Sequence, residues 1–512
     1  MNCFIESITL EESNDLGSPV KSTQTLKHAN PSNENEIHSR MKVSDEGKNL
    51  NFNKANEKGD FSKIYEIFNN NLPSEVNSLK KEQKYDVIKK SIDEYFVNEP
   101  ESLRIITAGF LFSEDIGRLP DQVPEWLDRE KFARGQKFAR DNLFGIFFAE
   151  YLALFLLFSF DDGLKPMILT QKSSEPYTAF KRYLSTSTRI RNWYNSDPWT
   201  KGSPAYKDLV AVNHLHQAIR NKLNSMTYEE IENAGTLPKT WSPIKDTLLK
   251  DFNETCPVAL PGQCPYTISE LRGIRPKGLN QGDMSATQCA FVCLMILYPD
   301  KFGVHDHVDE DLDAFCHLWR GIGYLLGIND EFNFCRGSLE DIKMRSKDFI
   351  DYWVKPNFRN ISPEWEHMMR CMHEGNQYYF PGSSYEVDLL FLTDLLELNM
   401  PRLQSLLTTS DWIMYYVTKF MMRHLVRIPQ IKSFLVRRLN EALDRALKYD
   451  EEKHETLRKK SSEVLNKVLN QTPMKNKQSF INLDISLQYK YIGLIVPFLL
   501  FFISWKINSM LM

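Results

Sequence analysis

The pattern of apolar positions predicts two helices within residues 180–224, joined by a turn-rich loop at 195–205. Asn, Asp, Pro, Gly and Ser gather in that loop, and these residues favour turns. Along the second helix, apolar residues recur at heptad-like spacing and form one inward face: Leu209, Val212, Ile219 and Leu223. His216 falls in this stripe at a position where the pattern calls for an apolar side chain. His214 lies about 200° around the helix, so we expect it to point elsewhere.

The first of these helices carries a second set of residues with chemical interest. Four residues share one face by their spacing of three and four: Arg182, Thr186, Arg189 and Trp193. An inward imidazole opposite an arginine and a hydroxyl is the arrangement that a haem or metal pocket needs. A histidine in an apolar stripe is also typical of a hydrogen-bonded core residue, and Arg182 with Thr186 also suits a solvated face. The two helices alone leave both interpretations open.

Residues 143–160 form an almost unbroken apolar run. Glu150 sits near its middle, and eighteen residues are at the short end of the range that spans a membrane. A helix that is apolar all round is also typical of the centre of a large helical domain. We favour the buried helix over the membrane-spanning alternative, and in such a core Glu150 would need a partner such as an arginine.

Composition and charge set the limits of the domain. Further helical patterns continue to residue 447, and 42% of the chain is apolar, so residues 61–449 are expected to form one large all-α domain. Residues 1–60 are rich in Asn, Ser, Lys and Glu, and we expect them to be disordered because they offer too little apolar surface to offset the entropy of ordering. The net charge of −4, with acidic and basic residues interspersed, gives no basic footprint for nucleic acid.

The end of the chain predicts a membrane contact. After a polar tether at 450–488, residues 489–512 contain an uncharged apolar run from Tyr491 to Trp505. A helix from Tyr491 to Met510 would cover about 30 Å, which is enough to span a bilayer. The first residues show no signal peptide, so we expect a single-pass C-terminal anchor with the body in the cytosol.

Other chemical motifs are weak. The eight cysteines show no paired metal-ligand spacing, and Cys289 with Cys293 are most simply small core residues. The histidines of the His305–His307 triplet stand beside several acids, which suggests a solvated turn more than a metal site. No phosphate-binding loop, dinucleotide fingerprint or nucleophile elbow appears in a suitable context.

The order of several motifs resembles the latex-clearing-protein, or rubber-oxygenase, family, which includes fungal membrane-bound oxygenases that cleave terpenoid side chains. Arg182-x-x-x-Thr186 is followed, 34 residues after the arginine, by His216 in a Val-x-x-x-His-x-x-x-Arg helix. Three flanking stretches look similar too: DIGRLPDQVPEWLD, MSATQCAFVCLMILYPDKFGV and FCHLWRGIGYLLGINDEFNFC. The resemblance spans roughly residues 114–429.

This resemblance implies a globin-like helical core that binds haem b, with His216 as the proximal ligand of the iron. Arg182 and Thr186 would lie on the side where O2 binds. The expected activity is oxidation or cleavage of a C=C bond in an apolar, unsaturated, isoprenoid or lipid-like substrate, such as a polyprenyl chain, at an intracellular membrane, the endoplasmic reticulum. Rubber oxygenases have a lysine where this chain has Ser185, which bears on polymer cleavage and not on haem binding.

Two alternatives remain open at this point. One is a non-haem metal oxygenase that uses His216 and nearby acids, although no second inward-facing histidine or carboxylate follows His216 at three or four residues. The other is a catalytically inactive, membrane-anchored scaffold that kept the fold.

Overall fold

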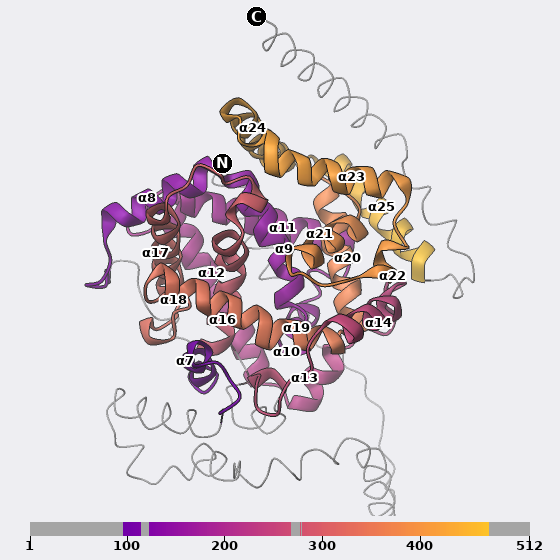
Figure 1. Cartoon of the computed structure of the whole chain (residues 1–512), viewed down its shortest axis with the longest axis horizontal. Coiled ribbons are helices and arrows are strands. Elements are labelled where there is room, and N and C mark those ends of the chain that lie inside the picture. The colour runs from indigo at the N-terminus through magenta and orange to yellow at the C-terminus, as the bar shows by residue number, and fades with distance from the viewer. Residues whose placement is uncertain (1–95, 114–121, 268–276, 278, 470–512) are drawn as a thin grey trace, which may run out of the picture. The chain divides into compact units, whose positions relative to one another are not determined.

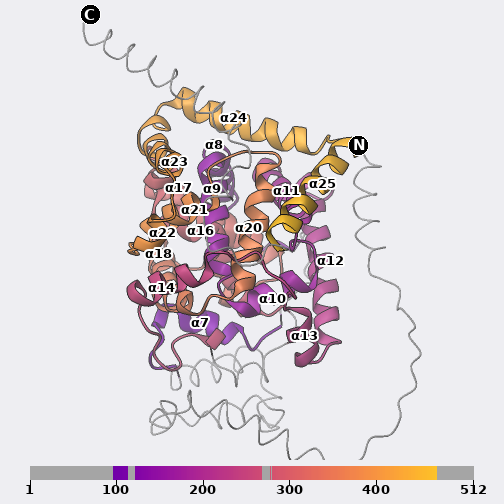
Figure 2. The same ribbon diagram turned by 90° about the vertical axis from the view of Figure 1, so that its right-hand side faces the viewer.

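The computed structural model describes residues 96–113, 122–267, 277 and 279–469, and every long regular element in these ranges is a helix (Figures 1 and 2). The first part of the domain contains α7 (Glu101–Gly109), α8 (Arg129–Asp141), α9 (Leu143–Leu157), α10 (Asp161–Leu169), α11 (Pro176–Asn195), α12 (Pro204–Asn224), α13 (Tyr228–Ala234) and α14 (Lys245–Thr255). The prediction of a large all-α domain is confirmed for this part of the chain.

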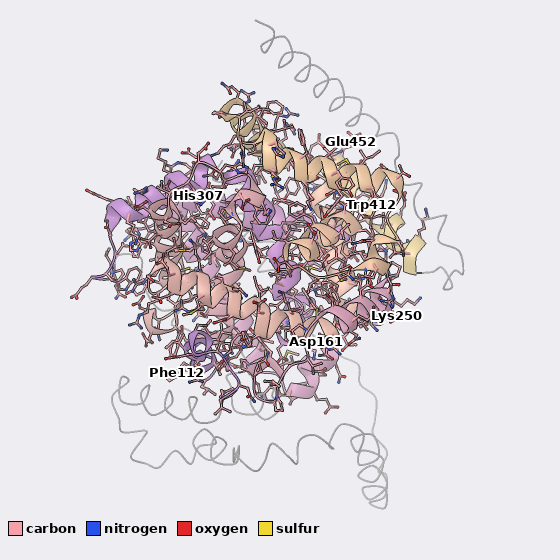
Figure 3. All side chains as sticks on the ribbon, in the orientation of Figure 1. Phe112, Asp161, Lys250, His307, Trp412 and Glu452 are labelled. Atoms are coloured by element: carbon pink, nitrogen blue, oxygen red, sulfur yellow. The ribbon has the colours of Figure 1, made fainter. Side chains whose placement is uncertain are left out.

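The second part of the domain is also helical. It contains α16 (Gln281–Leu297), α17 (Asp309–Leu325), α18 (Leu339–Asp348), α19 (Lys355–Asn357), α20 (Pro363–Gln377), α21 (Tyr385–Leu395), α22 (Pro401–Gln404), α23 (Thr409–Phe420), α24 (Pro429–Ala446) and α25 (Glu451–Leu469). Two stretches wind as π-helix, η4 (Phe349–Val354) and η6 (Met421–Leu425). Side chains fill the spaces between these helices (Figure 3).

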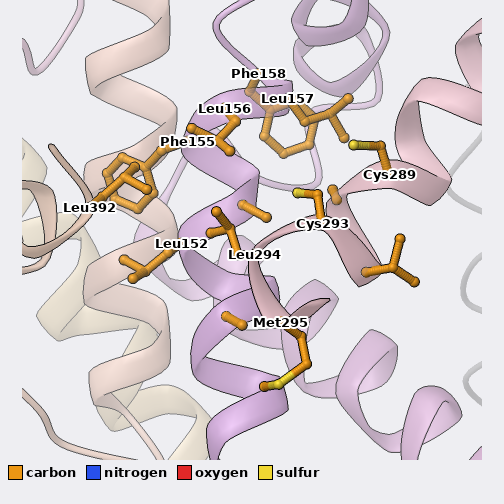
Figure 4. Packing of buried hydrophobic residues seen from close by; sticks show 14 of the residues in the cluster. Leu152, Phe155, Leu156, Leu157, Phe158, Cys289, Cys293, Leu294, Met295 and Leu392 are labelled. Atoms are coloured by element: carbon orange, nitrogen blue, oxygen red, sulfur yellow. The ribbon is translucent and has the colours of Figure 1, made fainter. Parts of the chain in front are cut away.

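Helix α9 forms the centre of the core. None of its residues is exposed, and it packs against α8, α16, α21 and α24. Figure 4 shows Leu152 and Leu156 of α9 close to the side chains of α16. An apolar surface that goes all the way round a helix must be covered on every side, so this helix dictates how its neighbours are arranged. The prediction of a buried helix is confirmed.

The described residues contain no single helix with both the length and the apolar character needed to cross a membrane. Helices α9 and α10 meet these conditions only as a pair, and the chain bends by 104° between them.

Helices α8 and α17 form the most extensive helix pair, and one glycine makes it possible. A Cβ atom at Gly135 of α8 would lie 2.2 Å from the carbonyl oxygen of Ala314 in α17. An ion pair of 2.8 Å between Arg134 and Asp311 borders the same contact. The two backbones therefore touch directly at this point.

The packed domain extends beyond residue 449. Residues 451–469, the first part of the segment expected as a polar tether, form α25, and this helix buries Leu457, Ser461 and Val464. The Ser461 hydroxyl accepts a hydrogen bond of 3.1 Å from the backbone N–H of Tyr177 at the start of α11. The expected disordered segment at 1–60 and the expected anchor at 489–512 lie outside the described residues.

All seven cysteines of the described residues are buried and none is in a disulfide. Cys289 and Cys293 lie on α16 among the leucines of α9, as Figure 4 shows, so their prediction as small core residues is confirmed. Burial raises the pKa of the Cys256 thiol to about 12 and that of Cys289 well above its ordinary range. The thiols of Cys256 and Cys289 are therefore uncharged packing groups.

We expect Gly135→Ala to lower the free energy of unfolding by about 1–3 kcal/mol, since the added methyl group forces α8 and α17 apart. Gly163→Ala in α10 is the matched control, because its Cβ would meet only the Leu157 carbonyl oxygen at 3.7 Å. This control should be neutral or stabilising by up to about 1 kcal/mol, given the higher helix propensity of alanine. Urea unfolding followed by circular dichroism measures both, and equal midpoints would contradict the close contact.

Candidate functional site

Helices α11 and α12 form the predicted hairpin, and local hydrogen bonds fix where each begins. Pro176 opens α11, with Glu175 and Thr178 forming a reciprocal cap. Pro204 opens α12, where the Ser203 hydroxyl accepts from the N–H of Tyr206 at 3.0 Å. The loop between them lies within the predicted range. The capping residues that fix the start of each helix, and the short loop between them, are thus visible in the sequence.

The apolar stripe of α12 is covered only at its two ends. Leu209 and Leu223 are fully buried, whereas Val212, His216 and Ile219 in the middle are half-buried. His214 is exposed, as its position around the helix predicted. Asn213, which the stripe did not include, is buried and donates a hydrogen bond of 2.9 Å to the carbonyl of Leu325. The middle of α12 therefore turns a partly covered face towards its neighbours.

His216 is the chemically unusual residue of this face. The ring as a whole keeps some exposure, but its Nδ1 atom is out of contact with solvent and has no hydrogen-bond partner in the described part of the chain. Burial lowers the pKa of His216 to about 4, and the positive charge of Arg182 adds to this effect. The imidazole is neutral at physiological pH, which is the form that binds metal.

Arg182 and Thr186 lie on α11, and both are half-buried. The positive charge of Arg182 helps to lower the pKa of His216, so the structure brings these two predicted residues within electrostatic range. Arg182 also donates a hydrogen bond of 3.3 Å to the Thr170 hydroxyl just after α10. The Thr186 hydroxyl donates to the Arg182 carbonyl at 3.0 Å, along its own helix. Ser185, beside Thr186, is half-buried too.

Glu150 ties α11 to the central helix, and its partner differs from our expectation. The partner is Tyr194 in the last turn of α11, whose hydroxyl donates a hydrogen bond of 2.9 Å to Glu150 Oε1. Burial raises the pKa of Glu150 to about 8, against a smaller lowering by this hydrogen bond. A neutral carboxyl does not need the cation that an ionised one would require, which explains why a tyrosine is sufficient.

Two further buried polar clusters join α20 to α21, and the sequence reasoning missed both. In the first, Arg370 lies between Glu366 and Glu386, with a contact of 2.8 Å to each. In the second, Asp388 accepts from the Tyr151 hydroxyl at 2.9 Å and contacts His373 Nδ1 at 3.2 Å. The four-residue spacing of Glu366 and Arg370 was a signal for the first cluster. The second joins residues far apart in sequence.

The other histidines mentioned above have ordinary partners. His305 Nε2 lies 2.8 Å from the carbonyl oxygen of Met422, and His307 Nδ1 lies 3.1 Å from that of Val304. Among the residues that the structure describes, no group of three His, Cys, Asp or Glu side chains could hold a metal ion. His216 is therefore of interest as a single ligand and not as part of a metal cluster.

Comparison with known proteins adds no relative: no family model, no curated protein and no solved structure matches this chain.

Glu150 gives a pH-dependent prediction. Its pKa of about 8 in the folded state exceeds the ordinary 4.5, so its favourable contribution to stability is fully present below pH 4.5 and is lost as the pH rises towards 8. Glu150→Gln keeps the shape without this loss. We expect the variant to gain stability relative to the wild type between pH 5 and pH 8, by on the order of a few kcal/mol.

Urea unfolding at several pH values measures this difference. Glu130→Gln, on the exposed side of α8, is the control and should leave the pH dependence of the wild type unchanged. A constant difference between Glu150→Gln and the wild type across this range would show that Glu150 is ionised in the fold.

Proposed function

We propose that this chain is a haem b oxygenase, and that the buried, unpartnered nitrogen of His216 is the observation that carries the proposal. A buried polar atom without a hydrogen bond costs about 1–3 kcal/mol, so its persistence calls for a reason. A neutral imidazole that coordinates haem iron is such a reason, since either ring nitrogen can be a ligand. The neighbouring Arg182 supports the same assignment by keeping the ring neutral.

The donor set favours haem over a non-haem iron centre. A mononuclear non-haem site typically needs two histidines and a carboxylate. The described residues offer no such triplet, whereas a porphyrin brings its own nitrogens and asks the protein for one axial ligand. His216 would hold the haem, within the globin-like core that the family resemblance implies.

Arg182 and Thr186 are proposed to act on the side where O2 is bound. When bound, the haem supplies the O2 chemistry that oxidises or cleaves a C=C bond. The guanidinium and the hydroxyl belong to half-buried side chains, and donors of this kind stabilise developing negative charge most strongly where water is excluded. In the structure the Thr186 hydroxyl donates to the Arg182 carbonyl, so it would have to exchange this helical hydrogen bond for one to a bound acceptor.

The proposed substrate is apolar and unsaturated, an isoprenoid or lipid-like molecule such as a polyprenyl chain. This extends the family resemblance and agrees with the apolar run at Tyr491–Trp505, proposed as a C-terminal anchor in an intracellular membrane such as the endoplasmic reticulum. Ser185 stands where rubber oxygenases have a lysine, so a small isoprenoid is a better candidate than a rubber polymer.

The cofactor assignment is tested by two histidine variants of the full chain. His216→Ala should lose haem or hold it weakly, because the side chain proposed to hold the iron is removed. His214→Ala, two residues away and exposed, should keep it. Soret absorbance per mole of protein measures both. A wild-type protein without a Soret band after haem is supplied would overturn the proposal and leave the inactive scaffold as the better description.

The roles of Arg182 and Thr186 are tested separately from haem binding. Arg182→Ala and Thr186→Val should each lower turnover of an unsaturated isoprenoid by about 10²–10³-fold, the typical cost of removing a donor aimed at developing charge. Their haem content should remain that of the wild type. Ser185→Ala, about 100° around the helix from Thr186, is the control and should cost less. Full activity in both the Arg182 and Thr186 variants would exclude their assignment.

A further inference from the structure

Helices α23 and α24, with η6 between them, carry an unusual charge pattern. From residue 412 to residue 440 the chain has six basic residues and no Asp or Glu. The basic residues are Lys419, Arg423, Arg427, Lys432, Arg437 and Arg438. The whole protein is slightly acidic, so this stretch stands apart from the rest of the chain. Figures 1 and 2 show α24 at the outside of the bundle in both views.

Aromatic side chains follow the same stretch at a spacing of four residues. Trp412, Tyr416, Phe420 and His424 succeed one another along α23 and η6. The rings of Trp412 and Tyr416 are stacked at 5.8 Å, and those of Phe420 and His424 lie 5.1 Å apart. Tyr416 is 62% exposed, although a large aromatic side chain gains free energy by burial. We call this stripe, with Lys419, Arg423 and Arg427 and the exposed Phe434, Arg437 and Arg438 of α24, the aromatic–basic face. Lys432 lies two residues from Phe434, about 200° around α24, and is not part of it.

The positive charge of this face is only partly compensated. Lys419 pairs with Asp394 at 2.7 Å, and Arg438 pairs with Glu441 at 2.8 Å. Arg423 and Arg427 are exposed and form no ion pair with any residue that the structure describes. The two arginines flank the end of the aromatic stripe. An aromatic surface bordered by the exposed side chains of Arg423 and Arg427 is thus presented to the surroundings.

We propose that the aromatic–basic face docks on the surface of an anionic lipid bilayer. Tyrosine and tryptophan rings suit the level of the lipid headgroups, with an apolar body and a polar edge. Each Lys or Arg near an anionic membrane surface contributes about 1 kcal/mol of attraction. Together these are the two components by which amphipathic helices lie in the plane of a membrane interface.

The charge pattern argues against a second copy of this chain as the partner. In a two-fold dimer the same surface patch faces itself, so Arg423 and Arg427 would approach arginines without any acid of the face between them. Anionic headgroups, in contrast, meet these cations with opposite charge along the whole face. The electrostatics therefore favour the bilayer.

Helix α24 is fixed to the rest of the domain. Both α24 and α25 pack on α11: Arg191 of α11 contacts Asp444 of α24 at 2.8 Å, and Tyr177 bonds Ser461 of α25. The residues after α25 include the apolar run Tyr491–Trp505. Docking by the aromatic–basic face is a second membrane contact, distinct from that run, and it does not depend on the proposed haem chemistry.

An environment-sensitive dye at residue 416 tests the proposal in the full chain. The dye is attached to Tyr416→Cys in a Cys3→Ser background, and the protein is reconstituted with vesicles of phosphatidylcholine, with or without phosphatidylserine. The seven other native cysteines are buried and stay unlabelled. We expect a blue shift of the dye emission with phosphatidylserine vesicles. A dye at Met344→Cys, which is 53% exposed on α18, should show no shift.

Charge reversal separates docking from simple tethering by the rest of the chain. Arg423→Glu with Arg427→Glu should abolish the blue shift at residue 416, even where the protein stays with the vesicles. Lys239→Glu with Lys250→Glu, two exposed lysines outside the face, is the matched control and should keep the shift. A dye at Phe434→Cys gives an independent reading should the variant at residue 416 misfold.

Three outcomes would overturn the proposal. One is an unchanged dye emission at residues 416 and 434 in vesicle-bound protein. Another is an equal shift at residue 344, which would mean unspecific insertion. The third is a shift that appears without vesicles and grows with protein concentration, which would identify a second copy as the occupant of the face.

Discussion

The architecture depends on the need to cover one helix on every side. Helix α9 has no polar face, so water must be excluded around its whole circumference. Helices from distant parts of the sequence meet this need: α8 from just before it, α16 and α21 from the middle of the chain, and α24 from near the end. A domain built in this way cannot be divided, because removing any one neighbour exposes the same apolar surface. Helix α11, which carries part of the candidate site, is tied to α9 by the hydrogen bond from Tyr194 to Glu150.

Polar groups inside such a core are held by different means according to their charge. Glu150 is kept neutral and needs only the Tyr194 hydroxyl. Arg370 stays charged and is held between two carboxylates. His216 is neutral as well, but its Nδ1 lacks any described partner. Among these groups, His216 is the one whose surroundings remain incomplete, which is why the proposed ligand is placed there.

Much of the fold was predictable because it rests on local signals. The α11–α12 hairpin follows from its turn residues and apolar stripe, and burial of α9 follows from its composition. Partners in the core were not predictable, since Tyr194 stands 44 residues from Glu150 and only tertiary packing brings them together. Helix α25 was also missed, although its buried residues Leu457, Ser461 and Val464 recur at spacings of four and three, because they are few and one of them is a serine.

The candidate site was predictable only in part. The spacing placed Arg182 on one face of α11 and His216 in the stripe of α12, and it left open whether they share a pocket. The structure brings the two residues within electrostatic range. The half-burial of the middle of α12 was not predictable. The sequence of an apolar stripe is the same whether or not other helices pack on the middle of that stripe. Haem, O2 and substrate remain predictions, since they depend on groups that the chain itself does not contain.

The buried cysteines can be used to measure how often different parts of the core open. Alkylation needs a thiolate that the reagent can reach. Burial keeps the reagent from the seven described thiols, and it also raises the pKa of Cys256 and of Cys289. Each thiol can react only during moments when its part of the core opens. Because these cysteines are spread from residue 256 to residue 371, their individual alkylation rates would map which helices separate first and how often. The side chains that fill the core thus also report the rates at which it unfolds locally.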